Sequence, residues 1–412
     1  MFKYFFILGS NPTLSIAELS TVFPQAPVTI ANQDALILDL NEKIDAKQLI
    51  TKLGGTIKIG RLDMNEWSFT PNGYNNIKNQ IIKLIDLKII KSKFKFGISY
   101  YGKAKFNLKP LGMEIKKFLK QSGVSSRWVT SQEPTLSSVV VEQNKLVDKG
   151  LEIVLIKTDN KILICRTLAV QPFKQLSFRD YGRPARDDYA GMLPPKLAQI
   201  MINLSHVGAG LAPAQKGDRQ GRPYKTDMTI LDPFCGSGTI LTEAMLMSYK
   251  NLIGSDISAK AVEATKTNIE WFIRNWKLEI RNLELYQLNV QNLSQKLKPC
   301  TVDAIITEPY LGPQRGKINL QKVIPELEKL YSQSLMEFKK VLKPAGRIVM
   351  VWPVFHSGNQ LIYLSPNLNS LKIINPIPPT LKDHPVIKLT ARGTIIYGRP
   401  QQEVWREIII LQ

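Results

Sequence analysis

Residues 232–239 combine glycines and polar side chains in an order that could bind a charged small molecule. The segment reads DPFCGSGT; it follows an apolar run at 228–231 and precedes an apolar-periodic stretch at 240–245. This order predicts a buried strand, a glycine turn and a helix. Gly236 and Gly238 let the backbone turn sharply and lie close to a ligand. The helix N-terminus then offers unpaired N–H groups to an anionic group of that ligand.

Acidic side chains beside this turn are suited to the polar parts of a nucleoside. Asp232 ends the first strand and can accept a hydrogen bond from an ammonium group. Asp256 follows a second apolar strand at 251–254, where a carboxylate suits ribose hydroxyls. Phe234 lies in the turn and Ile257 follows Asp256, so we expect both to contact the same ligand.

Other features of this region narrow the ligand class. Asn289 and Val290 follow a predicted strand at 283–288 and are expected to border an adenine ring. Residue 241 is a leucine, so the dinucleotide pattern Gly-x-Gly-x-x-Gly is absent, and no Gly-Lys-Ser/Thr phosphate loop follows. Cys235 is expected to be a small packing residue and not a nucleophile.

A second loop, TEPY at 307–310, follows a predicted strand at 302–306. Its position predicts that it reaches the carboxyl edge of the sheet, where ligands bind in open α/β sheets. Tyr310 offers a ring on which an extruded base can stack. Pro309 has no N–H and a fixed φ, which stiffens the turn. The alternative is a strand-ending proline turn with a buried tyrosine.

The first two residues of this loop offer hydrogen-bond acceptors for an amino group. The hydroxyl of Thr307 and the backbone carbonyl of Glu308 could hold such a group with its lone pair directed at an electrophile. The Glu308 carboxylate could also accept from the paired N1–H and N2–H donors of guanine. A solvated Glu308 that points out of the site is the alternative.

Both loops resemble known motifs. The segment at 232–239 resembles the cofactor loop of methyltransferases that use S-adenosylmethionine (SAM). The segment at 307–310 is similar to the Asp-Pro-Pro-Tyr motif of enzymes that methylate exocyclic amino groups of nucleic-acid bases. In this comparison Thr307 replaces the Asp and Glu308 replaces the first Pro. The resemblance implies SAM as cofactor. Glu308 departs from the motif, but a carboxylate beside the sulfonium would favour SAM electrostatically.

The chain is strongly basic, and the charge is uneven. Its 55 Lys and Arg against 34 Asp and Glu give a net charge of +21, which favours an anionic polymer as partner. Residues 88–120 contain ten lysines and one acid, Glu114. An amphipathic helix is predicted at 111–120, and Lys116, Lys117 and Lys120 lie off its apolar face. These three lysines are predicted to bind phosphates; a merely solvated surface is the alternative.

Three further stretches resemble one family. They are FILGSNP at 6–12 with LSIAEL at 14–19, SRWV, LSSV and NKL within 126–146, and GMLPPKLA at 191–198. All look like THUMP-domain tRNA guanine-N2 methyltransferases, the family that modifies position 10 of tRNA. The resemblance implies tRNA as substrate, with THUMP modules gripping its acceptor end, and adds Arg127 to the RNA-binding residues.

The predicted fold class is α/β, a Rossmann-like SAM-dependent methyltransferase domain preceded by α+β ferredoxin-like and THUMP domains. The boundaries are 1–55 for the ferredoxin-like domain, 56–170 for THUMP, 171–189 for a linker and 190–412 for the methyltransferase domain. A loop is predicted at 208–224, a helix from the N-cap Ser258 through Trp276, a helix at 327–342, a turn at 343–346 and a closing hairpin at 393–411.

The expected activity is methyl transfer to the exocyclic N2 of a guanosine in tRNA. The alternatives are an RNA-binding THUMP protein without catalysis and an amino-methyltransferase that acts on rRNA or DNA. Three cysteines without metal spacing argue against a zinc site and fit a reducing, cytoplasmic compartment. The apolar start at 1–8 is short and is predicted to be a strand. No membrane span is expected, because no run of about 18 apolar residues occurs.

Overall fold

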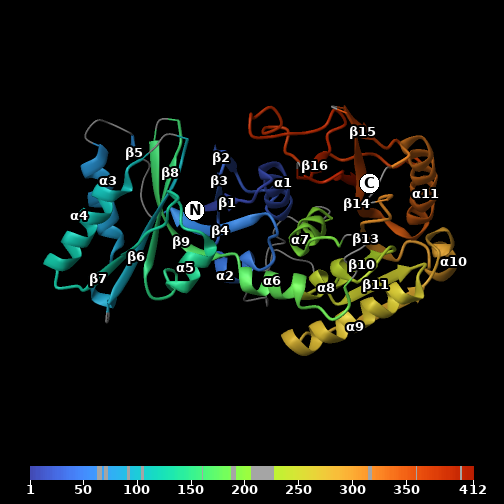
Figure 1. Cartoon of the computed structure of the whole chain (residues 1–412), viewed down its shortest axis with the longest axis horizontal. Helices are drawn as coiled ribbons and strands as arrows, with labels where there is room; N and C mark the ends of the chain where they lie inside the picture. Colours follow the sequence, from blue (N-terminus) through green and yellow to red (C-terminus); the bar gives the residue numbers. More distant parts are fainter. Residues whose placement is uncertain are drawn as a thin grey trace. The chain divides into compact units, whose positions relative to one another are not determined.

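The computed structural model describes most of the chain, in two compact units (Figure 1). The described residues are 1–62, 67–68, 73–90, 93–103, 106–159, 161–186, 192–205, 227–313, 318–358, 360–399 and 401–412. The first unit comprises Met1–Pro12, Ala26–Thr51 and Gly55–Lys174, and the second comprises Thr13–Gln25, Lys52–Gly54 and Gln175–Gln412. The loop predicted at 208–224 lies outside the described residues.

One sheet of nine strands organises the described part of the first unit, in the order β2-β3-β1-β4-β9-β8-β6-β7 with β5 beside β9. The strands are β1 (Phe2–Leu8), β2 (Val28–Asn32), β3 (Ala35–Leu40), β4 (Thr56–Leu62), β5 (Trp67–Ser68), β6 (Phe94–Tyr101), β7 (Ser126–Val129), β8 (Leu151–Lys157) and β9 (Lys161–Val170). Strand β4 pairs with both β1 and β9. The boundary predicted at 55–56 therefore falls inside a continuous sheet, and the division into ferredoxin-like and THUMP domains stays a prediction.

Short helices accompany this sheet, and one of them carries the predicted basic face. They are α2 (Ala46–Ile50), α3 (Gly73–Leu84), η1 (Leu87–Ile89), α4 (Leu108–Gln121) and α5 (Ser138–Gln143). In α4, Leu111, Ile115 and Leu119 are fully buried. The Asn107 side chain caps the helix by accepting from Lys109 N at 3.1 Å. The amphipathic helix predicted at 111–120 is thus confirmed.

The second unit is built on a mostly parallel sheet in the order β12-β11-β10-β13-β14-β17-β16, with β15 beside β14. The strands are β10 (Thr229–Asp232), β11 (Asn251–Asp256), β12 (Asn282–Gln287), β13 (Val302–Thr307), β14 (Leu342–Ser357), β15 (Gln360–Tyr363), β16 (Ile395–Tyr397) and β17 (Val404–Leu411). Strands β10 to β14 run parallel, whereas β15, β16 and β17 are antiparallel to their neighbours. The Rossmann-like sheet is confirmed, and its strand order reverses between β10 and β13.

Helices cover both faces of this sheet. They are α7 (Pro195–Leu204), α8 (Thr239–Leu246), α9 (Ala259–Trp276), α10 (Leu293–Lys296), α11 (Leu320–Val341) and the short η2 (Val290–Asn292). Figure 1 shows α7 and α11 on opposite sides of β14. Ser258 caps α9 by accepting from Ala261 N at 3.3 Å, as the sequence predicts. Apolar side chains of α11, including Leu335 and Phe338, pack in the core with those of β13 and β14.

A helix from the N-terminal region also belongs to the second unit. Residues Thr13–Gln25 include nearly all of α1 (Pro12–Val22). The fully buried Glu18 accepts from Gly54 N at 2.9 Å and from Asn203 Nδ2 at 2.7 Å. These hydrogen bonds provide partners for a carboxylate that would be costly to bury alone.

Two segments differ from expectation. The predicted turn at 343–346 lies inside β14, where the pairing with β13 shifts register between Val302 and Ala304, so the residues form an irregularity in a strand. The predicted linker contains helix α6 (Phe173–Tyr181). Arg179 of this helix and Arg183 after it are both buried, and Arg179 Nε lies 3.0 Å from Glu243 Oε1. None of the described helices is long and apolar enough to cross a membrane.

Candidate active site at the switch point of the parallel sheet

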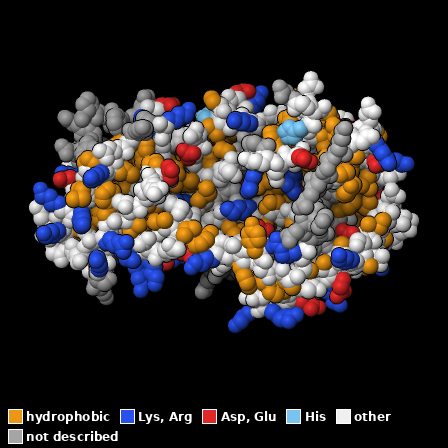
Figure 2. All heavy atoms as spheres, viewed as in Figure 1, with side chains coloured by type: hydrophobic (Ala, Val, Ile, Leu, Met, Phe, Trp, Pro, Cys, Tyr) orange, Lys and Arg blue, Asp and Glu red, His pale blue; other side chains and the backbone are white. Residues whose placement is uncertain are grey.

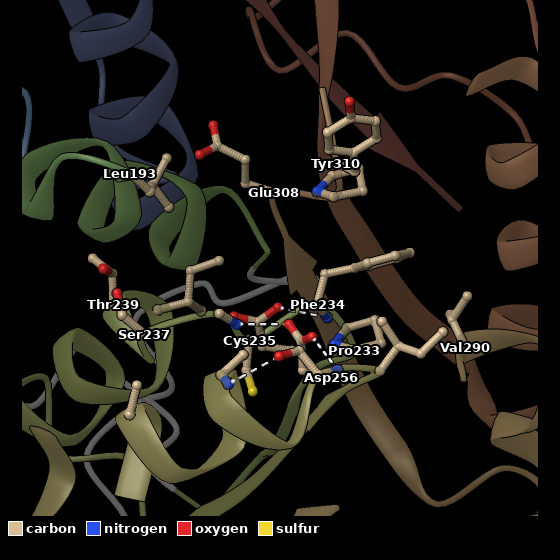
Figure 3. A pocket seen from close by; sticks show the side chains of 18 of the residues that line it. Leu193, Pro233, Phe234, Cys235, Ser237, Thr239, Asp256, Val290, Glu308 and Tyr310 are labelled. Carbon is tan, nitrogen blue, oxygen red and sulfur yellow. Dashed lines mark hydrogen bonds between the residues drawn. The ribbon is translucent and has the colours of Figure 1, made fainter. Parts of the chain in front are cut away.

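A cavity of about 1170 Å³ lies at the carboxyl edge of the parallel strands in the second unit. Its walls come from the loops that follow β10, β11, β12 and β13, together with residues 184–186 and 192–193. This is the edge at which open α/β sheets bind ligands. In Figure 3, Glu308 and Tyr310 lie on one side of this cavity, and Asp256 with the glycine turn lies on the other.

The glycine turn after β10 has the geometry that the sequence predicts. Gly236 and Gly238 have φ values of +53° and +81°, a region that favours glycine. A Cβ atom on Gly236 would meet nothing within 4 Å, so the backbone is open on that side. Gly238 begins α8 without a side-chain cap. In the first turn of α8, Thr239 Oγ1 accepts from the buried Arg183 Nη1 at 2.6 Å, a contact that the sequence did not indicate.

Asp256 links the glycine turn to the start of α9. Its Oδ2 accepts from Gly236 N at 3.0 Å, and its Oδ1 accepts from Ser258 N at 2.9 Å. Each carboxylate oxygen has a second lone pair. Asp256 lines the cavity, so it can accept further hydrogen bonds from a ligand while it holds the turn in place.

Asp232 is a buried carboxyl group in the cavity wall, with 2% of its surface exposed. Burial raises its pKa from the ordinary 3.8 to about 7, and the nearby charges of Asp256 and Glu308 add to the rise. Two hydrogen bonds oppose this shift. Its Oδ1 accepts from Thr307 Oγ1 at 2.8 Å and from Phe234 N at 3.3 Å.

Thr307 therefore has a different contact from the one expected of it. The side chain is fully buried at the end of β13, and its hydroxyl donates to Asp232. It is not one of the described residues that line the cavity, whereas Glu308, Pro309 and Tyr310 are. The hydroxyl that was expected to hold an amino group instead fixes the carboxylate next to it.

Glu308 is paired, and not solvated. Arg406 Nε donates to its Oε1 at 2.5 Å, and Arg406 Nη2 lies 3.4 Å from its Oε2. The Glu308 side chain is 11% exposed and that of Arg406 is 9% exposed. The structure therefore does not support the alternative of a solvated Glu308. Sequence reasoning missed Arg406, although its strand was predicted as part of the closing hairpin.

Tyr310 presents its ring to solvent at the cavity. The residue is 60% exposed, so the alternative of a buried tyrosine is wrong. Its backbone carbonyl accepts from the hydroxyl of Tyr331 at 2.8 Å, and Tyr331 is buried in α11. The backbone of this loop is thus fixed while the aromatic ring stays available for stacking.

The remaining predicted cofactor residues surround the same space. Ile257 is 67% exposed at the cavity, Val290 is buried in its wall, and Phe234 and Asn289 also line it. The Asn289 side chain accepts from Gln291 N at 3.0 Å and so caps η2. Burial raises the pKa of the Cys235 thiol, which argues against a thiolate nucleophile. Among the described residues, no group of three or more His, Cys, Asp or Glu is placed to hold a metal ion.

The predicted RNA-binding residues lie in the first unit. Lys116, Lys117 and Lys120 are exposed on α4, and Arg127 is exposed on β7. The two elements pack together, since a Cβ atom on Gly112 of α4 would lie 2.5 Å from the ring of Trp128 of β7. Figure 2 shows Lys and Arg side chains over the part of this unit that carries α4 and β7. The exposed lysines of α4 form the basic face, whereas Arg127, next to Trp128 in β7, points to the opposite face of the sheet.

The chain is similar to known methyltransferases. Residues 223–363 match the family described as UPF0020, an RMKL-like methyltransferase domain. The tRNA (guanine(10)-N2)-dimethyltransferase of Methanothermobacter thermautotrophicus is 32% identical over 56% of this chain and 60% of its own length. A probable tRNA (guanine(10)-N2)-dimethyltransferase of Methanothermococcus thermolithotrophicus is 31% identical over 32% of this chain and 70% of its own length. The chain spans about half the length of the first curated relatives that it matches.

The solved structures agree on the fold. TrmN from Thermus thermophilus superposes with a TM-score of 0.53 at 14% identity, and the match covers 100% of this chain and 99% of that one. At this identity the likeness concerns the fold alone. The family match places a methyltransferase domain at residues 223–363, which contain most of the residues that line the cavity.

The raised pKa of Asp232 predicts a specific dependence of stability on pH. A carboxyl group with a pKa of about 7 when folded and about 4 when unfolded stabilises the fold fully below about pH 4, and this contribution is lost as the pH rises to about 7. Relative to Asp232→Asn, the wild type should lose up to about 1.4 kcal/mol per pH unit in this window. Calorimetric unfolding of both proteins across the window measures the difference. If the free energy of unfolding depends on pH in the same way in both proteins, the raised pKa of Asp232 is contradicted. Burial also raises the pKa of Glu243, but Glu243 is present in both proteins, so its contribution cancels in the difference.

Proposed function

The chain belongs to the tRNA (guanine(10)-N2)-dimethyltransferase family, and we propose that it transfers a methyl group from SAM to the exocyclic N2 of a guanosine in tRNA. One observation carries the proposal. A single cavity brings the glycine turn and the carboxyl groups of Asp232 and Asp256 together with Glu308 and the exposed ring of Tyr310. A site for a charged nucleoside cofactor and a site for an amino-bearing base are thereby adjacent.

The residues of the cavity fit SAM. Asp232 is placed for the methionine ammonium, and the uncapped start of α8 is placed for the carboxylate. Asp256 keeps lone pairs for the ribose hydroxyls, while Ile257 and Val290 offer apolar contacts to the adenine. When bound, SAM supplies an electrophilic methyl group on a sulfonium, whose positive charge suits a cavity with three acidic side chains.

The loop after β13 is proposed to hold the base. Tyr310 stacks on the extruded guanine, a contact worth about 1–3 kcal/mol. Glu308 is the first side chain of this loop that reaches the cavity, so it takes the role of acceptor for the guanine donors. Thr307 acts through Asp232 and keeps the loop in register. With SAM held by these residues, N2 would receive its methyl group, the sulfur would keep the electron pair of the broken bond, and N2 would lose a proton to solvent.

The first unit is proposed to bind the body of the tRNA. Its basic face of Lys116, Lys117 and Lys120 supplies cations for phosphates, and the exposed Arg127 supplies another on the opposite face of the sheet. The resemblance of the segments SRWV, LSSV and NKL within 126–146 to a THUMP module supports this role. A non-catalytic RNA-binding protein would need the basic face but not the arrangement around the cavity, and a DNA amino-methyltransferase would have no use for a THUMP module.

Nucleoside analysis of the product tests the proposal. Incubation with methyl-labelled SAM should label tRNA and not duplex DNA, and mass spectrometry of digested tRNA should show N2-methylated guanosine. Tyr310→Ala should lower methyl transfer by roughly 10- to 100-fold with little change in SAM affinity, because it removes the stacking contact. Tyr310→Phe keeps the ring and should retain most activity. N6-methyladenosine or a ribose-methylated nucleoside as main product would refute the substrate assignment.

Salt dependence tests the basic face. Replacing Lys116, Lys117 and Lys120 with alanine should weaken tRNA binding and make its dependence on salt shallower. Each lost phosphate contact reduces the log–log slope by about 0.7–0.9. The matched control replaces the same three residues with arginine, which preserves the charge and should preserve the slope. If the alanine variant keeps the wild-type slope, the basic face is a solvated surface.

A further inference from the structure

We propose that Arg406 is a positioning residue, which holds Glu308 so that one oxygen of its carboxylate accepts a hydrogen bond from the amino group of the target guanine. The inference rests on the proposed function and deepens it. It assigns a part in substrate selection to a residue that lies outside both loops and 98 positions after Glu308 in the chain.

The sheet brings these two residues to the same edge. Strand β13 ends at Thr307, which lies opposite Met350 of the parallel strand β14. Strand β17 runs antiparallel to β14 and places Arg406 opposite Pro353, three residues beyond Met350. The start of β17 therefore lies at the carboxyl edge, where Glu308 leaves the sheet.

The contact distances distinguish the two carboxylate oxygens of Glu308. Oε1 is 2.5 Å from Arg406 Nε, a short charge-assisted hydrogen bond. Oε2 is 3.4 Å from Nη2, which is near the limit for a hydrogen bond. Oε2 is therefore the oxygen with more accepting capacity left for a ligand. Glu308 lines the cavity, while Arg406 is not one of the described residues that do so, and the guanidinium supports the carboxylate without occupying the site.

A neighbouring ion pair, between Glu407 of β17 and Arg392, serves as a structural comparison. The next residue of β17, Glu407, is fully buried and accepts from Arg392 and from Thr394. Consecutive residues of a strand point to opposite faces. Neither Arg392 nor Glu407 is among the described residues that line the cavity, so this pair contributes to the sheet but does not reach the substrate.

A fixed acceptor at Oε2 selects the base by its donor pattern. Guanine presents N1–H and N2–H on one edge, so Oε2 can accept from the amino group while N1–H also faces the carboxylate. Adenine presents an acceptor at N1, and its lone pair would face the negative charge of Glu308. Orientation matters because a displacement of about 1 Å at the reacting nitrogen can cost on the order of 100-fold in rate.

Steady-state kinetics with tRNA, together with SAM affinity and unfolding temperature, tests this role. Arg406→Lys keeps the charge but loses the planar fork, and it should lower kcat by about 10- to 100-fold while SAM affinity and KM for tRNA stay close to wild type. Arg392→Lys is the matched control, because it makes the same change in the neighbouring pair, and it should leave kcat unchanged even if it lowers the unfolding temperature.

A double variant decides whether Arg406 acts through Glu308. If it does, Arg406→Gln combined with Glu308→Gln should lose no more activity than Glu308→Gln alone. If the losses of activity in the double variant multiply, the proposal is overturned. It is also overturned if Arg406→Lys keeps the wild-type kcat, or if kcat falls in both Arg406→Lys and Arg392→Lys in proportion to their loss of stability. A wild-type protein that methylates no tRNA would instead refute the proposed function and this inference with it.

Discussion

The hydrogen bond from Thr307 to the buried carboxyl group of Asp232 joins the loops after β10 and β13, both of which line the cavity. Asp232 ends β10 and Thr307 ends β13, and these strands are neighbours at the point where the strand order reverses. Because the threonine side chain is directed inward, the backbone that follows carries Glu308 and Tyr310 out to the cavity. Asp256 adds a second link by holding the glycine turn through Gly236. The loop proposed to hold the cofactor and the loop proposed to hold the base are thereby fixed relative to each other.

The same arrangement concentrates acidic side chains around one cavity. Asp232, Asp256 and Glu308 all line it, and each has a defined source of compensation. Asp232 has the Thr307 hydroxyl and a backbone N–H, Asp256 has two backbone N–H groups, and Glu308 has Arg406. Such hydrogen bonds offset the cost of keeping carboxylates in a poorly hydrated place. A cation is the ligand that such a site favours, in agreement with a sulfonium cofactor.

Local sequence signals were enough to locate the parallel sheet and most of the site. Apolar runs, paired glycines and the Ser258 cap act over a few residues, so β10, β11, β13 and α9 were predicted close to their observed bounds. Contacts between distant segments could not be read in this way. The partner of Glu308 depends on how β17 joins the sheet, and the helix in the predicted linker depends on the buried pair of Arg179 with Glu243. The inward direction of Thr307 likewise follows from the packing of β13 against β10.

Methyl transfer to a tRNA transcript with one guanosine replaced by inosine tests directly whether the exocyclic N2 of guanine is the methyl acceptor. Inosine keeps N1–H and O6 but lacks the exocyclic N2 amino group. When the replaced guanosine is the one that becomes modified, incorporation of labelled methyl groups should fall to background while the protein still binds the transcript. Replacement of a guanosine elsewhere in the transcript should leave incorporation intact. Undiminished methylation of a transcript with inosine at the target position would show that another atom is the acceptor and would contradict the assignment of guanine N2.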